Sequence, residues 1–77
     1  MSDSELKTQI DKGWQQLDKL RGEIRLKLHL GGMDLRDAFA AIDKEAHTLG
    51  HTVSQATKMA VQDLNKRLQK IADALTP

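Results

Sequence analysis

Two histidines, His47 and His51, are the residues whose spacing best suits chemistry, because they stand four positions apart. On a helix this spacing places both imidazoles on one face, where they can share a metal ion. No third ligand is evident, since Glu45 stands too close to His47 for the Glu-x-x-His motif of di-metal helix bundles. We expect His47 and His51 to face solvent, with no resident metal and no cofactor.

The remaining composition also points away from catalysis. The chain has no cysteine, which removes thiolate ligands, disulfides and cysteine nucleophiles and suits the reducing cytoplasm. The pair Gly31 and Gly32 in "LHLGGM" is better explained as a turn between helices than as a phosphate loop. We therefore expect a cytoplasmic protein that is not an enzyme.

Length and charge indicate how such a protein would act. A chain of 77 residues buries only about 60% of its unfolded surface, so association with a partner is expected. Twelve Lys and Arg against eleven Asp and Glu are interspersed and leave a net charge of +1. This balance gives little support for binding a nucleic acid. No stretch approaches the roughly 20 apolar residues of a membrane span, and the mixed polar face also argues against a second alternative, an amphipathic binder of lipid surfaces.

An apolar stripe predicts the first helix. At about 100° per residue, seven apolar residues fall within an arc of roughly 120°, the width of a face that packs on a core: Leu6, Ile10, Trp14, Leu17, Leu20, Ile24 and Leu28. We predict a helix over about 3–30, a turn at 31–33, and Met33 packed against the start of the next helix.

A second stripe runs from Leu35 to Leu75 and keeps its phase for forty residues. It predicts one long helix over about 34–75, so that residues 1–77 form a single all-α domain, an antiparallel helical hairpin with a longer second helix. In this hairpin Ile24 lies opposite Phe39. Trp14 lies opposite Gly50, which gives that glycine a packing role.

The longer helix would overhang its partner, leaving four large apolar side chains uncovered: Leu64, Leu68, Ile71 and Leu75. We expect this stripe to dock on a second copy, giving a dimer or higher oligomer of the four-helix-bundle type, or on another helical protein. Leu26 and Leu30 lie off the hairpin seam and are a second candidate contact. The predicted function is therefore protein interaction or oligomerisation, as a scaffold, adaptor or regulator.

Gly50 supports an alternative architecture, because glycine costs about 1 kcal/mol inside a helix. A break there gives helices at about 3–30, 34–49 and 52–75. The third helix would then fold back on the first two. The result is a monomeric three-helix bundle that needs no partner.

The run "IRLKLHL" at residues 24–30 alternates apolar and polar residues, which is also typical of a strand. With the helices and the "GHTVS" segment that follow, residues 24–70 resemble the ribbon-helix-helix repressors. In that family a two-stranded ribbon formed by a dimer enters the major groove of DNA. The resemblance implies a DNA-binding regulator in which Arg25, Lys27 and His29 contact bases.

Overall fold

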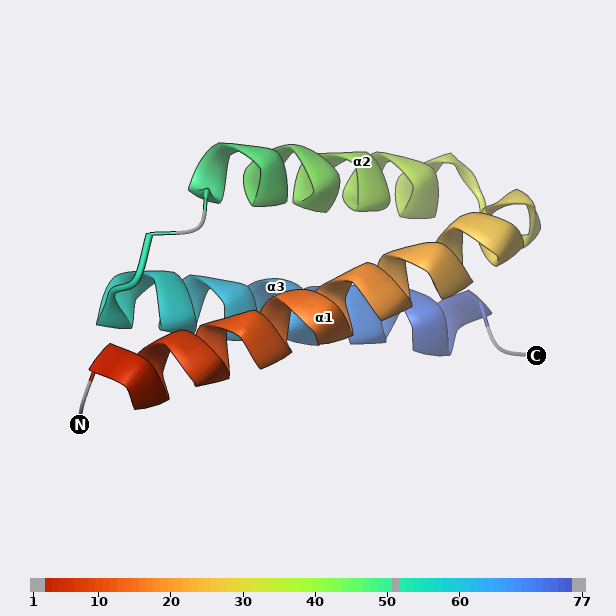
Figure 1. The fold of residues 1–77 in the computed structure, drawn as a ribbon. Coiled ribbons are helices and arrows are strands. Elements are labelled where there is room, and N and C mark those ends of the chain that lie inside the picture. The colour runs from red at the N-terminus through yellow and green to blue at the C-terminus, as the bar shows by residue number, and fades with distance from the viewer. Residues whose placement is uncertain (1–2, 51, 76–77) are drawn as a thin grey trace.

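The computed structural model describes residues 3–50 and 52–75, and it is all-α, as predicted. Helix α1 spans Asp3–Lys27, a 3-10 turn, η1, spans Leu28–Leu30, helix α2 spans Met33–Leu49, and helix α3 spans Gln55–Leu75 (Figure 1). No residue in the two described ranges lies in a β-strand.

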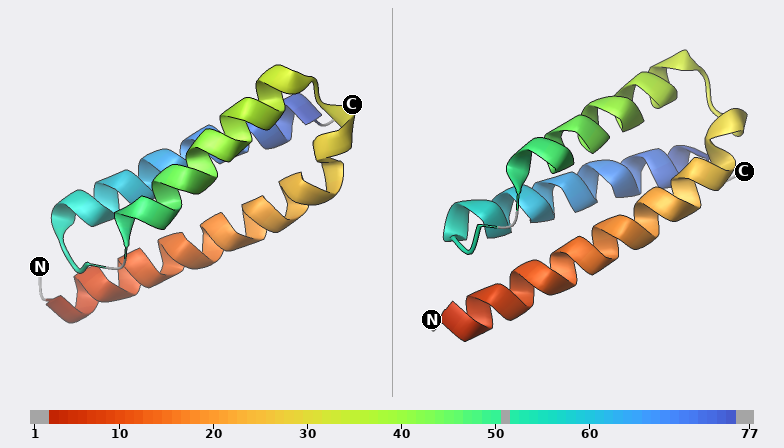
Figure 2. Two further views of the ribbon diagram at one scale, coloured as in Figure 1. Left: turned by 90° about the horizontal axis from the view of Figure 1, so that it is seen from above. Right: turned by 45° about the horizontal axis from the view of Figure 1, so that its top comes forward.

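The three helices form an elongated bundle of 42 × 21 × 15 Å. Helices α1 and α3 run side by side in the same direction, and α2 runs back between their opposite ends (Figures 1 and 2). The closest packing of backbones is between α1 and α3, whereas α2 packs mainly on α3. The bundle is therefore a tight pair of helices covered by a third.

The first predicted helix is confirmed almost to its ends. Residues 24–27 belong to α1 and residues 28–30 form η1, so the alternative prediction of a strand over 24–30 is wrong. The α1 stripe supplies a large part of the core, with Ile10, Leu17, Leu20 and Ile24 all buried. Helical packing of this stripe, rather than the local alternation, decides the conformation.

The second predicted helix is interrupted. It divides into α2 and α3 at Gly50, whose φ of 71° is the left-handed conformation that glycine adopts without strain. Ser54 then caps α3, because its Oγ accepts a hydrogen bond from the Thr57 backbone N–H at 3.1 Å. The single helix over 34–75 is therefore wrong, and the three-helix alternative has the right elements.

The break overturns two further predictions about packing. A Cβ added to Gly50 would meet no atom within 4 Å, so this glycine serves the turn and not the packing of Trp14. The four residues predicted to form a docking stripe are buried within their own chain, because α3 folds back on the other two helices: Leu64, Leu68, Ile71 and Leu75. Ile24 and Phe39 belong to the same core, and Trp14 packs against it partly buried.

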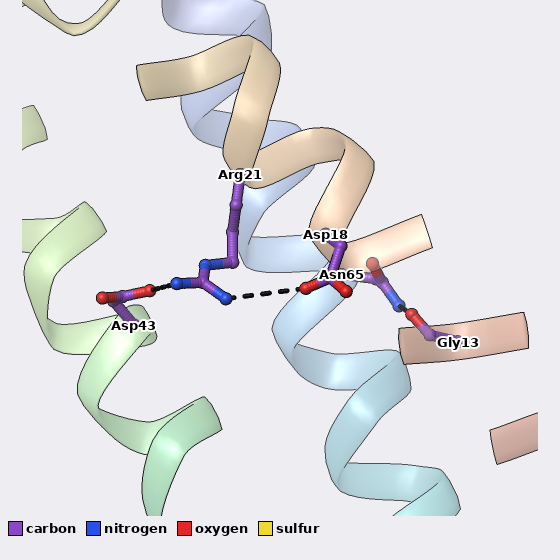
Figure 3. A network of polar contacts seen from close by, with 5 residues as sticks. All are labelled: Gly13, Asp18, Arg21, Asp43 and Asn65. Carbon is purple, nitrogen blue, oxygen red and sulfur yellow. Dashed lines mark hydrogen bonds and ion pairs between the residues drawn. The ribbon is translucent and has the colours of Figure 1, made fainter. Parts of the chain in front are cut away.

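Polar contacts fix how the helices sit against one another (Figure 3). The Asn65 side-chain Nδ2 on α3 donates to the Gly13 carbonyl on α1 at 3.1 Å. Arg21 on α1 forms ion pairs with Asp43 on α2 and, at 3.6 Å, with Asp18 on its own helix. Both α2 and α3 thus make a polar contact with α1.

None of the helices in the described ranges combines the length and the apolar character needed to cross a bilayer.

Candidate functional site

Three exposed large apolar side chains lie close together in the chain where α1 turns into α2. Leu26 is 79% exposed, Leu30 is 62% exposed and Met33 is 75% exposed. The turn between α1 and α2 lies at one end of the elongated bundle (Figure 2), and we call these three residues the apolar tip. Exposed large apolar side chains in one region of a fold are candidates for a binding site.

The turn that carries the apolar tip packs against the core on its inner side. The Gly31 backbone N–H donates to the Leu28 carbonyl at 3.1 Å and closes η1. A Cβ on Gly31 would come within 2.9 Å of Leu75 Cδ2 and 3.0 Å of Leu35 Cδ1, so a larger residue would require these leucine side chains to shift. Leu28 and Leu35 pack partly buried against the core. These inward contacts leave the three tip residues on the outside.

Charged residues of both signs stand beside the apolar tip. Arg25, Lys27 and Arg36, which we call the basic rim, are exposed, and so are Glu23, Asp34 and Asp37. Arg25 and Lys27 stand in the last turn of α1, where cations are also favoured by the helix dipole. On the α3 side, Lys27 borders a small cavity together with Asp73. The basic rim can therefore pair with acidic groups on a partner, and the neighbouring acids can pair with basic groups.

Of the two histidines that were candidates for a metal site, the structure describes only His47. His47 is exposed on α2 and borders a cavity of about 260 Å³ that Trp14 and Gly50 also line. His29 lies in η1, at the other end of α2, and His51 lies outside the described residues. Within the described ranges no three His, Cys, Asp or Glu side chains are grouped closely enough to hold a metal ion.

The residues proposed for base contacts also lack the element that would present them. Arg25 and Lys27 are exposed on α1 and His29 is exposed in η1, so they do not stand in a row on a strand. A ribbon-helix-helix repressor reads DNA with a two-stranded ribbon. The described part of this chain contains no strand from which to build one.

The apolar tip was only partly predicted. Leu26 and Leu30 were candidate contacts because they lie off the seam of the first helix, and both are exposed. Met33 was expected to pack against α2, but Gly32 precedes the helix in an extended conformation and Met33 itself begins it. Its side chain is therefore exposed, which the hydropathy pattern alone did not predict.

Comparison with family models, with curated proteins and with solved structures finds no match to this chain.

Proposed function

We propose that the chain is a non-catalytic helical module that binds another protein through the apolar tip, acting in the cytoplasm as an adaptor or regulator. The observation that carries the proposal is the exposure of Leu26, Leu30 and Met33 on a turn whose other apolar residues are packed. Burying three such side chains is worth roughly 4 to 9 kcal/mol in total. After the cost of association, this corresponds to a weak, reversible complex.

The chemistry of the apolar tip describes the partner. Three flexible or branched apolar side chains on a rigid turn fit a shallow apolar groove, such as one between two helices. Arg25, Lys27 and Arg36 can pair with acidic residues on the rim of that groove. The basic rim sets the rate of encounter and the salt dependence, while the apolar residues set the lifetime of the complex.

The test places a photo-crosslinking amino acid at position 30 or at position 59 in cells. Met59 is the matched control, since its side chain is 62% exposed, as is that of Leu30, but it lies on α3 away from the tip. We expect position 30 to crosslink to one defined protein and position 59 not to do so. Calorimetry with the purified partner should then show binding that Leu30→Asp abolishes and Met59→Asp preserves.

Three results would overturn this function. Equal crosslinking from positions 30 and 59 would remove the special role of the apolar tip. Binding to anionic lipid vesicles that Leu30→Asp abolishes would assign the tip to a membrane surface. Salt-dependent retention of duplex DNA that Arg25→Ala abolishes would assign the basic rim to a nucleic acid.

A further inference from the structure

The buried faces of α2 and α3 lie in line along the sequence even though the helices are separate in space. If both are placed on one continuous helix at about 100° per residue, the centres of their buried faces differ by only about 30°. The buried residues are Phe39, Ile42 and Ala46 on α2, and Thr57, Val61, Leu64, Leu68, Ile71 and Leu75 on α3. Joining the two helices would therefore keep one continuous apolar face.

Val53 lies between α2 and α3 and belongs to that face by the same count. In the three-helix bundle it is 42% exposed and contributes nothing to the core cluster. On a joined helix it would fall within the apolar stripe, about 30° from its centre. The bundle thus leaves unused an apolar residue that a joined helix would bury.

The separation of α2 from α3 depends on two local features. Gly50 adopts a φ of 71°, which a residue with a side chain adopts only with strain. The Ser54 side chain caps α3 by accepting the Thr57 N–H. Both features stabilise the broken form alone, because a joined helix needs neither of them.

The packing of α2 on α3 leaves part of α3 uncovered. The Glu45 carboxylate pairs with Arg67 at 2.5 Å, which places these two residues level with each other. Because α2 and α3 are antiparallel, Leu49, the last residue of α2, is then level with Asp63 on α3. Leu49, Ala60, Asp63 and Leu64 accordingly border one groove of about 410 Å³. The first two turns of α3 extend beyond the end of α2, as Figure 1 shows, and lie beside α1.

We propose that this surface is covered by a second copy of the chain, through exchange of α3. In the exchanged dimer α2 and α3 join into one helix, and α3 of each copy packs on α1 and α2 of the other. Every contact of the bundle is remade between copies, which is what makes exchange a low-cost route to dimers. In the dimer the register set by Glu45 and Arg67 continues past Leu49. The first turns of α3 of one copy therefore lie against residues 50–54 of the other, which are helical in this form. Val53 lies in this new contact.

The test is the molar mass by light scattering coupled to size exclusion, over a concentration series. Gly50→Ala penalises the broken form and favours the joined helix, so it should lower the dimer dissociation constant by at least about a hundredfold, since both copies change. Ser54→Ala should act in the same direction through loss of the cap, by roughly tenfold or more. Val53→Asp should suppress dimers while leaving the helical circular dichroism unchanged. Leu30→Asp, which changes an exposed leucine at the other end of α2, should change neither property.

A charge exchange distinguishes this dimer from two closed bundles that merely touch. Glu45→Arg alone and Arg67→Glu alone each place like charges together within one chain. In an exchanged dimer of one variant with the other, both pairs become opposite charges again. Native mass spectrometry of the mixture should therefore show more mixed dimer than random pairing gives.

Two results would overturn the proposal. One is a single-chain mass for Gly50→Ala and for Ser54→Ala at every concentration. The other is random pairing of the two charge variants. These measurements need no other protein, and the apolar tip stays exposed at both ends of the exchanged dimer, so the outcome is independent of the proposed function.

Discussion

At the scale of single residues, three glycines hold the fold for three different reasons. Gly50 supplies the left-handed turn between α2 and α3. Gly31 allows Leu75 and Leu35 to pack beneath the tip turn. Gly13 lets α1 approach α3, because a Cβ there would lie 2.6 Å from Val61 Cγ1. The Gly31 turn was predicted from the sequence, and the break at Gly50 was the alternative architecture. The close approach at Gly13 was not predicted, since a packing role depends on which helices become neighbours.

Gly13→Ala should destabilise the protein by about 1 to 2 kcal/mol. The new methyl group overlaps a buried, β-branched side chain, and the cost of overpacking exceeds the gain in helix propensity. The Asn65 hydrogen bond to the Gly13 carbonyl would also lengthen. Urea unfolding measures the change. Gly22→Ala is the control, because Gly22 is exposed in the same helix and a Cβ added there would meet no atom within 4 Å. This substitution should stabilise the protein by roughly 0.5 to 1 kcal/mol. Equal effects of the two substitutions would contradict the close approach of α1 and α3.

At the scale of elements, the helical faces were predictable and their arrangement was not. The stripe placed Ile24, Phe39 and Leu68 on buried faces, and all three are buried. The break at Gly50 was predicted only as the alternative, because α3 resumes almost in the phase that a continuous helix would have. Its local signal was the pair Ser54 and Thr57, which form the cap of α3. Without the break, the apolar residues of α3 appeared to lack a partner in their own chain.

Leu68→Ala tests which arrangement holds, because an overhanging stripe and an internal core predict different results. Leu68 is fully buried in the core cluster, so its truncation should cost about 2 to 5 kcal/mol. A chain of 77 residues has about 4 to 12 kcal/mol of total stability, so much of the bundle would unfold. The measurement is thermal unfolding by circular dichroism at low protein concentration. Leu26→Ala, which removes an exposed leucine on α1, should change the stability by less than about 0.5 kcal/mol. A folded, fully stable Leu68→Ala monomer would contradict the internal core.

At the scale of the whole molecule, the apolar tip and the connection at Gly50 lie at opposite ends of α2. A change at one is therefore independent of the other. In the proposed exchanged dimer the two connections meet near the centre and the two apolar tips point outward at the ends. Such a dimer would present two binding surfaces on one rigid body, and two weak contacts on one body hold a multivalent partner far longer than one.

The length of the dimer follows from the same geometry. A joined helix from Met33 to Leu75 rises about 1.5 Å per residue, and two of them in the Glu45 to Arg67 register span about 70 Å. The closed bundle is 42 Å long. Small-angle X-ray scattering of Gly50→Ala at concentrations where it is dimeric should therefore give a maximum dimension near 70 Å, slightly increased by the side chains and hydration.

Two other dimers predict different lengths. Closed bundles packed side by side would remain close to the 42 Å of one chain, and bundles joined through their apolar tips would reach about twice that length. The second of these would also be lost in Leu30→Asp, whereas the exchanged dimer would not. A 70 Å particle that persists in the double variant Gly50→Ala with Leu30→Asp thus identifies exchange of α3, and either of the other lengths excludes it.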